Sequence, residues 1–594
     1  MTARIAPKSR ATVNRPLHTE AVLPCLVSFV PFVVRPLSLL LNRRTLAAAI
    51  LLAACHMALA QSAPAGSQGV YLIITRPMFT DALAPLIQRR TADGFTVSTS
   101  TDSPDAALRS LAGRPAMILL VGDDSGGAEP RAENPWSLPA RRVPFYRWRA
   151  VQAEDMPTDA AFGDLDADGI PDVPVGRLPV RSVDQLAALI AKIVAYEDAP
   201  PRLDDLTIPL WAGTADAGPT LDAVLEAFVS ACLESFTPPW VQPWVIFGRE
   251  GSPLCYWPPM QASAFQQHCR DGGAVAWLIG HGSRDGFYSM EFQGRTIAYD
   301  VATVRATLTA GPPTGPLIIL ACSCGDFTGR TDCFAEALLH APGGPVAVVA
   351  ATTESHPLPN FFTAQSAIAA LGRGPQRLGD LWLAAQLAAL RAQSPVFEAV
   401  LAPIEGTLEA TLNTGRLRRD QLLLYALLGD PATRLRLPAP LHGRLDLRPD
   451  GWYWTIDKPP DADTLFVSFR YHQFIPPAAG SPRRQVATLH SLGDGARADA
   501  VSSNPQSEIR IPKSAVLGPQ SLSAESAHRA ALARYDFAPV ATFSADQPWT
   551  GRCTTPGLLR LVAVGPRNIY AVALPLGIPT SASAPTSTPS PATP

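Results

Sequence analysis

Short, continuous runs of apolar residues recur along the first three quarters of the chain and alternate with stretches of helical periodicity. Val70 to Ile74 is the first such run, and Met117 to Val121 and Leu317 to Ala321 are later examples. Runs of this kind are typical of strands buried on both faces, as in a parallel sheet. Helical spacing is clearest after Ser182, which forms a capping box with Gln185. The alternation predicts βαβ units and therefore an α/β fold.

The chain of 594 residues is too long for a single hydrophobic core, so we expect several domains. Strand and helix patterns alternate twice, which predicts two α/β subdomains, over residues 70–203 and 204–437. Further on, short strand-like segments separated by turn residues predict an all-β sandwich over residues 441–575. The Ser/Thr/Pro-rich residues 576–594 are predicted to form a disordered tail.

The N-terminal region has the pattern of an export signal. Two arginines precede a short apolar stretch, and small residues ending at Ala60 fit a cleavage site. This predicts a leader over residues 1–60 and a linker over residues 61–69. The same stretch also fits a lipoprotein signal with Cys55 as the lipidated residue, but cleavage after Ala60 would remove that cysteine. We favour cleavage after Ala60 and expect an exported protein that is secreted, periplasmic or held at the cell surface.

Composition and charge narrow the classes of partner. Hydrophobic residues make up 47% and charged residues 17% of the chain, which is an ordinary globular composition. The net charge of −2 gives no reason to expect nucleic acid or an anionic surface as a partner. No apolar run of about 18 residues follows the leader, so we do not expect the mature chain to span a membrane. Removal of Cys25 and Cys55 with the leader would leave seven of the nine cysteines, and an odd number leaves at least one thiol unpaired.

Two of the apolar runs end in chemically reactive side chains. Residues 274–279 lead into Gly280 and His281, and residues 317–321 lead into Cys322. Reactive groups of open α/β sheets lie beyond the carboxyl ends of the strands. An imidazole and a thiol on two such strand ends form a general base and a nucleophile. The pattern therefore predicts a cysteine hydrolase.

Both residues also have plainer interpretations. Cysteine is among the most buried residue types, so Cys322 alone would be an inert core residue, and His281 alone a loop histidine held by a carbonyl. Their matching positions after two strands favour the catalytic interpretation. The glycines on either side of His281 let the backbone approach a ligand. We therefore expect the backbone N–H groups of Gly282 and Cys322 to stabilise an oxyanion.

An acidic loop forms a second motif. Asp164, Asp166 and Asp168 alternate along it, with a glycine at the sixth position. Carboxylates at this spacing around a sharp turn suit a hard cation such as Ca²⁺. The twelfth position is Val175 and not Glu, so the loop is not an EF-hand, and a plain acidic turn is the alternative. We expect these three aspartates to hold a structural Ca²⁺ ion, and we expect no organic cofactor.

Two segments resemble the active-site motifs of the gingipain-type cysteine peptidases, a family of the caspase-like clan. They are Gly280-His281-Gly282-Ser283 and Ala321-Cys322-Ser323-Cys324-Gly325-Asp326-Phe327, and further matches follow in the same order over about residues 70–437. The resemblance implies a caspase-like catalytic unit of two α/β subdomains followed by an immunoglobulin-like sandwich. It also implies that His281 is the general acid/base and Cys322 the nucleophile of peptide-bond cleavage.

The same resemblance implies further site residues. An acidic residue ahead of the Val-Gly-Arg segment supports the histidine in this family, which implies that Asp172 orients His281, although Asp172 would alternatively bind the cation. Glu354, Ser355 and His356 would line the primary substrate pocket. The carboxylate of Glu354 would there pair with Arg or Lys at the cleaved position.

One position departs from the family pattern. Cys324 stands where the family usually has another residue type. It would be a decoy nucleophile, a disulfide partner for Cys333, or a free thiol.

The sequence therefore predicts an exported cysteine endopeptidase that acts on proteins or peptides. Two alternatives remain open at this point. The first is a surface binding or adhesion module that keeps the fold without turnover. The second is a sortase-like transpeptidase, which would transfer the acyl group to an amine instead of water.

Overall fold

The computed structural model describes the chain from residue 68 to residue 576, with gaps. The described residues are 68–126, 131, 133–146, 154–216, 218–374, 376–394, 414–471 and 519–576. The chain divides into two units, Met1–Gly66 and Ser67–Pro594, and every described residue belongs to the second unit. The predicted leader, and nearly all of the predicted linker and tail, lie outside the described residues.

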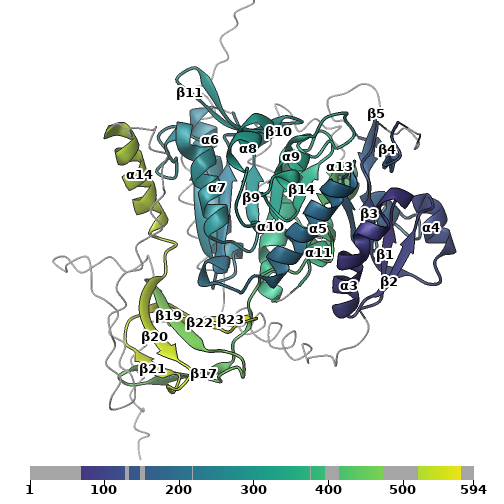
Figure 1. The fold of residues 1–594 in the computed structure, drawn as a ribbon. Coiled ribbons are helices and arrows are strands. Elements are labelled where there is room, and N and C mark those ends of the chain that lie inside the picture. Colours follow the sequence, from purple (N-terminus) through teal and green to yellow (C-terminus); the bar gives the residue numbers. More distant parts are fainter. Residues whose placement is uncertain are drawn as a thin grey trace, which may run out of the picture. The chain divides into compact units, whose positions relative to one another are not determined.

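A ten-stranded sheet is the centre of the α/β region (Figure 1), with the strand order β2-β1-β3-β6-β15-β14-β13-β9-β7-β8. The strands are β1 (Val70–Ile74), β2 (Thr96–Ser100), β3 (Pro115–Val121), β6 (Val175–Leu178), β7 (Thr207–Ala212), β8 (Gln242–Phe247), β9 (Ala276–Ile279), β13 (Leu317–Leu320), β14 (Val348–Ala351) and β15 (Tyr425–Leu428). β1, β3 and β6 pair parallel, as do β9, β13 and β14, whereas β14 and β15 pair antiparallel. The predicted α/β class is confirmed, and one sheet contains strands of both predicted subdomains.

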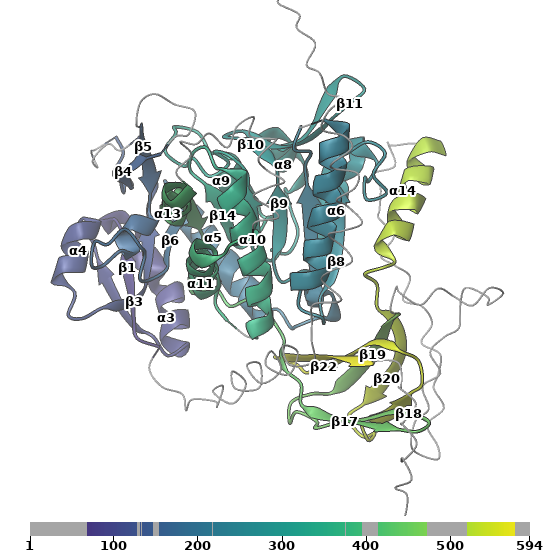
Figure 2. The ribbon, with the colours of Figure 1, turned by 180° about the vertical axis from the view of Figure 1, so that it is seen from behind.

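Helices cover both faces of this sheet, which explains why its strands are apolar throughout. α5, α7 and α9 lie on one face in Figure 1, and α6, α10 and α11 lie on the other in Figure 2. The helices are α3 (Ala84–Ala92), α4 (Pro104–Ser110), α5 (Val183–Asp198), α6 (Pro219–Phe236), α7 (Gln261–Asp271), α8 (Val301–Thr307), α9 (Phe334–His340), α10 (Pro357–Ala370), α11 (Leu378–Arg391) and α13 (Thr414–Leu424). Single 3-10 turns are η1 (Pro77–Phe79), η2 (Asp81–Leu83), η3 (Ala160–Gly163), η4 (Leu203–Leu206), η5 (Pro258–Met260) and η6 (Leu371–Arg373).

The start of α5 follows the sequence pattern. Ser182 precedes the helix in an extended conformation, and its hydroxyl accepts a hydrogen bond from the Gln185 backbone N–H at 3.2 Å. This bond satisfies one of the N–H groups that every helix start leaves without an internal partner. Leu186, Leu189 and Ile190 are buried, as their helical spacing predicts.

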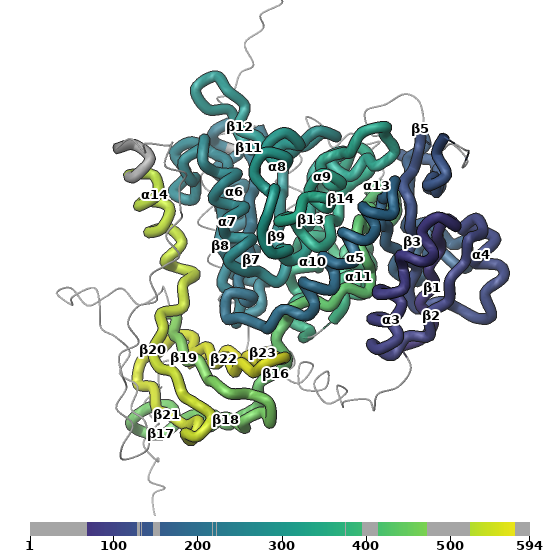
Figure 3. The backbone as a smooth tube through the Cα atoms, in the orientation of Figure 1, coloured from purple at the N-terminus to yellow at the C-terminus, as the bar shows by residue number. Residues whose placement is uncertain are grey.

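Two smaller sheets flank the large one. β4 (Arg141–Phe145) and β5 (Glu154–Thr158) pair antiparallel. β10 (His281–Ser283), β11 (Gly286–Phe292) and β12 (Arg295–Asp300) form an antiparallel sheet in that order, and β11 and β12 make a hairpin that Figure 3 traces. Because β10 begins at His281, this sheet determines the path of the backbone on the carboxyl side of the candidate base.

The C-terminal region contains two sheets around a shared apolar core, to which Trp454, Leu465 and Leu561 belong. One has the order β16-β23-β22-β19-β20 and the other β17-β18-β21. The strands are β16 (Ala439–Pro440), β17 (Gly443–Arg448), β18 (Gly451–Ile456), β19 (Thr464–Tyr471), β20 (Ala538–Ser544), β21 (Thr550–Cys553), β22 (Gly557–Val564) and β23 (Ile569–Leu576). Two sheets over one core agree with the predicted sandwich, while an immunoglobulin-like arrangement stays a prediction.

The all-β prediction fails at one helix, α14 (Pro519–Leu532), which lies between β19 and β20 in the chain. α14 packs outside its own region: His528 Nε2 donates to the Val245 carbonyl at 2.8 Å, and Tyr256 donates to Glu525 at 2.7 Å. These contacts are tertiary, so local turn signals did not indicate them. Among the helices of the described ranges, none combines the length and the hydrophobicity that a membrane crossing requires.

Candidate active site

The register of two neighbouring strands brings the predicted base and nucleophile to one edge of the sheet. β9 and β13 pair parallel, with Ile279 opposite Leu320. The Gly280 N–H donates to the Leu320 carbonyl at 3.2 Å and extends this ladder by one step. His281 and Cys322 each lie two residues beyond the Ile279/Leu320 pair. The imidazole and the thiol therefore leave the sheet from adjacent strands at the same carboxyl edge.

The His281 side chain is exposed and held by a backbone carbonyl. Its Nε2 atom lies 3.3 Å from the Ala215 oxygen, in the segment that follows β7. A carbonyl oxygen only accepts, so this bond places the ring proton on Nε2 and leaves Nδ1 as the basic nitrogen of the neutral ring. Gly280 precedes it with a φ of +154°, and a Cβ there would lie only 3.3 Å from the Gly213 backbone. A glycine is thus required for the approach to His281.

Cys322 follows β13 at a sharp turn, because Ser323 has a left-handed φ of +56°. The Ser323 N–H donates to the Thr353 carbonyl at 2.9 Å, which ties this turn to the loop after β14. In that loop the Ser355 N–H points at the Cys322 sulfur at 3.3 Å, and the Ser355 carbonyl lies 3.6 Å from the same atom. The carbonyl can accept from a thiol, and the N–H can donate to a thiolate.

Gly282, one of the two predicted oxyanion donors, packs against the Cys322 turn. A Cβ at this position would lie 2.5 Å from Cys324 Sγ and 3.0 Å from the Cys322 carbonyl oxygen, so only glycine fits. Cys324 itself is buried, and its thiol lies 3.7 Å from the Gly286 carbonyl. Burial raises the pKa of the Cys324 thiol far above its usual value, which disfavours a nucleophilic role. Cys324 and Cys333 are both free thiols, so they do not form a disulfide in this structure.

The three predicted substrate-binding residues lie between β14 and α10 and have different surroundings. Ser355 contacts the Cys322 sulfur, as described above. His356 is buried, and its Nδ1 accepts the Leu358 N–H at 3.1 Å, which caps the start of α10. Glu354 is half-buried in the same loop. The structure therefore brings Ser355 to the Cys322 sulfur, whereas His356 caps the start of α10.

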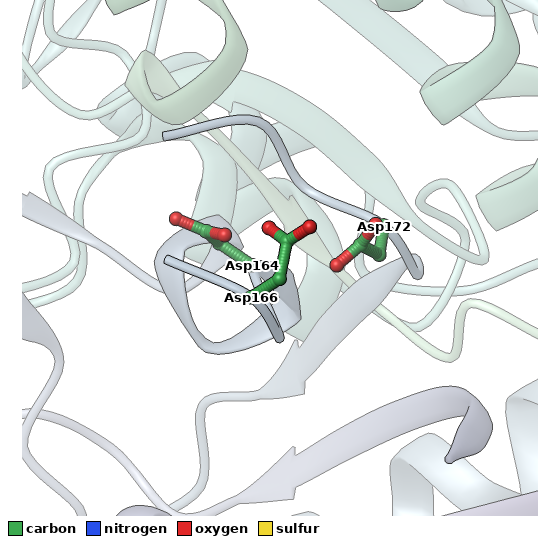
Figure 4. Close-up of side chains that lie close together, drawn as sticks. All are labelled: Asp164, Asp166 and Asp172. Atoms are coloured by element: carbon green, nitrogen blue, oxygen red, sulfur yellow. The ribbon is translucent and has the colours of Figure 1, made fainter. Parts of the chain in front are cut away.

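The acidic loop gathers three carboxylates, but not the three that the spacing predicts. Figure 4 shows Asp164, Asp166 and Asp172 facing a common space, and one oxygen of each lies within 4.8 Å of the others. Asp168 is turned differently, and its carboxylate accepts the Ile170 N–H at 2.8 Å. The predicted set is thus corrected by the structure, because the turn at Gly169 brings Asp172 back to the start of the loop.

The structure does not bring Asp172 to His281. Asp172 precedes the amino end of β6, whereas His281 follows the carboxyl end of β9. The carboxyl end of β6 is the end near the nucleophile turn, because Arg181 beyond it donates to the Gly329 carbonyl at 3.3 Å. Asp172 accepts the Leu165 N–H at 3.0 Å and lies 2.6 Å from Arg114.

These partners explain the ionisation of Asp172. Its slight burial opposes ionisation, but the Leu165 amide and Arg114 outweigh that and lower its pKa. The Asp172 carboxylate therefore bonds to the acidic loop and to Arg114, and it does not contact His281.

Two arginines to which the sequence assigned no role contact the Cys322 turn and the residues that follow it. Arg177 is fully buried and makes a bidentate pair with Asp159, with both distances 2.7 Å, while its guanidinium lies over the Phe327 ring. Arg181 pairs with the buried Asp123 at 2.6 Å. Burial raises the pKa of Asp123 to about 6, even though Arg181 opposes the shift. The Val-Gly-Arg segment was the only sequence signal for this anchor.

Comparison with known proteins identifies the family. Residues 65–436 match the model of peptidase family C25. The chain belongs to peptidase family C25. The gingipain-type resemblance of its motifs is thereby confirmed, and the protein is a cysteine-type peptidase with proteins or peptides as its class of substrate.

Solved structures add a distant likeness. The Arg-specific cysteine proteinase gingipain R (RgpB) is 14% identical, over 87% of this chain and 99% of its own, at a TM-score of 0.46. A complex of the Porphyromonas gingivalis RgpB pro- and mature domains is 14% identical, over 85% of this chain and 100% of its own, at a TM-score of 0.44. With TM-scores below 0.5, these structures add nothing to the family assignment. No curated protein matches the chain.

Proposed function

We propose that this C25 peptidase is an exported endopeptidase in which Cys322 is the nucleophile and His281 the general acid/base. The observation that carries the proposal is the shared register of β9 and β13, which sends both residues from one sheet edge. In this reaction His281 takes the proton of the Cys322 thiol, the thiolate attacks the peptide carbonyl carbon, and the peptide C–N bond breaks to leave a thioester. His281 gives a proton to the departing amine and then takes one from the water that cleaves the thioester.

The developing oxyanion needs hydrogen-bond donors close to the position that the carbonyl oxygen takes up in the transition state. The backbone N–H groups of Gly282 and Cys322 are the proposed donors. Their support is the close packing of Gly282 on the Cys322 turn, where no side chain fits between the two. A donor pair on backbone that is held by close packing needs no reorganisation during the reaction.

A Cys322→Ala variant tests the nucleophile, with Cys324→Ala as its matched control. We expect Cys322→Ala and His281→Ala each to lower kcat/KM on peptide substrates by at least about a thousandfold. Cys324→Ala should keep most of the activity, because that thiol is buried and stays protonated. Circular dichroism checks that all three variants fold. Full activity in folded Cys322→Ala would end the assignment.

A preference for Arg or Lys at the cleaved position is the finer part of the proposal and rests on Glu354. Its support is the position of Glu354 one residue before Ser355, which contacts the nucleophile. A library of peptides that vary at the cleaved position measures the preference. Glu354→Gln should reduce cleavage after Arg and Lys more than cleavage after neutral residues, because only the ion pair is lost. An unchanged profile would refute the role of Glu354.

Export and calcium binding are further parts of the proposal. Export rests on the signal-like leader, and Edman sequencing of the mature protein should begin at Gln61. A structural Ca²⁺ rests on the carboxylates of the acidic loop, since a hard cation prefers oxygen ligands. Calcium should then raise the melting temperature, and Asp164→Asn should abolish that rise. A melting temperature that calcium leaves unchanged would exclude the ion.

A further inference from the structure

A buried cluster of uncharged polar side chains lies directly behind Cys322. It contains Ser355, Asn360 of α10, Gln421 of α13 and Tyr425 of β15, and all four are buried. Such groups cost free energy in a protein interior unless each one finds a hydrogen-bond partner. Apolar side chains would pack α10 against α13 and β15 without that cost. The cluster therefore calls for an explanation beyond packing.

The hydrogen bonds made by the Asn360 amide run toward Ser355. Tyr425 donates to Asn360 Oδ1 at 2.7 Å, and Gln421 Nε2 donates to the same oxygen at 3.0 Å. Two donors on Oδ1 orient the amide, so that Asn360 Nδ2 donates to Ser355 Oγ at 3.0 Å. Burial raises the pKa of the Tyr425 phenol far above its usual value, although contact with Ser355 opposes the shift. The phenol thus stays protonated at neutral pH and acts as a donor.

The last members of this chain reach the sulfur. Ser355 Oγ accepts from Asn360, and its own hydroxyl lies within hydrogen-bonding reach of both the Tyr425 phenol and Cys322 Sγ, which is 3.8 Å away. The Ser355 backbone N–H lies nearer, at 3.3 Å from the same sulfur. Both groups favour a negative charge on the sulfur, because donors stabilise the anionic form of their acceptor.

We propose that Asn360 is a positioning residue for Cys322: together with Tyr425 and Gln421 it orients Ser355 so that its donors favour the thiolate. This inference rests on the proposed role of Cys322 as the nucleophile. Asn360 touches neither the sulfur nor a substrate, and it acts through Ser355. A chain of aligned donors strengthens each of its bonds, so the far end of the cluster contributes as well.

The test measures the pH dependence of Cys322 alkylation by iodoacetamide, read by mass spectrometry on the full chain. A Cys324→Ala background leaves one labelled thiol near the site. Asn360→Leu should raise the pH midpoint of alkylation by roughly half a unit to one unit, because Ser355 then loses the hydrogen bond that orients its donors toward the sulfur. Tyr425→Phe should raise the midpoint less, because it removes only one donor to Asn360 and keeps the ring packing.

Gln386→Met is the matched control. Gln386 is also buried here, but it donates to the Gln421 backbone carbonyl at 3.1 Å and lies outside the donor chain. The midpoint should stay unchanged in this variant. The inference is overturned if folded Asn360→Leu and Tyr425→Phe keep the wild-type midpoint, or if Gln386→Met shifts it equally.

Alkylation needs no peptide turnover, which separates this inference from the proposed function. A midpoint shift in a protein that cleaves no peptide would support the positioning of Cys322 and contradict the endopeptidase. In an active enzyme, kcat should fall roughly threefold to tenfold in Asn360→Leu at neutral pH, with KM nearly unchanged. The loss should shrink as the pH rises above the shifted midpoint.

Discussion

Two buried polar clusters of this molecule differ in charge, and the difference separates support of the fold from support of the reaction. The first surrounds Arg90, whose guanidinium contacts Asp430 at 2.7 Å, Asp93 at 2.7 Å and Glu197 at 3.0 Å. Tyr71, near the start of β1, donates to Asp430 at 2.7 Å. The second is the uncharged cluster behind Cys322. Both are buried, but only one ends at a reactive atom.

The charged groups of the first cluster pair with one another. Each nitrogen of the buried Arg90 guanidinium has a carboxylate partner, and the carboxylates share further arginines at the surface. Burial opposes the charge on Arg90, but the neighbouring Asp430 and Glu197 more than compensate and raise its pKa. A closed network of this kind joins α3, α5 and the end of β15. The uncharged cluster, in contrast, directs its donors to one open end, so its effect appears as reactivity.

Removal of one partner from the charged cluster should have the largest effect on stability. Asp430→Ala leaves Arg90 buried with a missing partner, and we expect the free energy of unfolding to fall by about 3–5 kcal/mol. Urea unfolding followed by fluorescence measures the loss. The control is Asp198→Ala, since Asp198 pairs with Arg89 at the surface and should contribute about 0–1 kcal/mol. Equal losses in both variants would show that the buried cluster has no special role.

The uncharged cluster should show the opposite balance of effects. Tyr425→Phe removes one hydroxyl and leaves Asn360 Oδ1 bonded to Gln421, so the unfolding free energy should fall by only about 1 kcal/mol. The fractional loss of activity in this variant should nevertheless exceed that of Asp430→Ala, compared at a temperature where both are folded. Parallel urea unfolding and peptide cleavage measure the two quantities. A reversed order would remove the distinction between the clusters.

A third ionic group, around the partly exposed Asp332, extends the comparison because its contribution to stability depends on pH. Asp332 follows the Cys322 turn in the chain and lies near His340, Arg181 and Arg305. The contact with His340 at 3.6 Å, and then the arginine charges, lower the pKa of Asp332 in the folded protein against its partial burial. A carboxyl whose folded pKa lies below its unfolded value stabilises the fold above the unfolded pKa and loses this contribution as the pH falls through the folded pKa.

Asp332→Asn should therefore lower stability by roughly 0.5–1 kcal/mol at pH 6, with the difference vanishing well below pH 4. Thermal melting of both proteins at several pH values measures this difference. A constant difference at all pH values would mean that the effect of the substitution is not electrostatic.

Local sequence was sufficient for the strands and for the placement of His281 and Cys322 on two strand ends. Each apolar run lies within one strand. The sequence therefore identifies the strand, and the side chain that follows it, without information from the rest of the fold. For this reason His281 and Cys322 were predicted on adjacent strand ends, and β9 and β13 do pair in that way. The capping of α5 by Ser182 is similarly local and is confirmed.

The predictions differ from the structure where a contact depends on tertiary geometry. One such case depends on the end of a strand that a residue occupies, and another depends on the way a loop turns back. Asp172 was expected to support His281, but it lies before its strand while the histidine lies after its own. Asp168 was expected in the carboxylate group, but the turn at Gly169 brings Asp172 to Asp164 and Asp166 instead. Sequence spacing gives distances along the chain, and neither the return of a loop nor the direction of a side chain follows from it.

The order of apolar runs and the two motifs after them determined the α/β class and the cysteine-peptidase chemistry, because these depend on short stretches of chain. Only the tertiary structure decided what surrounds the thiol. Asn360 and Tyr425 are 65 residues apart, and Tyr425 reaches Asn360 because β15 enters the sheet antiparallel beside β14. Neither residue belongs to a sequence motif, because a hydrogen bond to a buried amide requires only a suitable polar group at the right place in space.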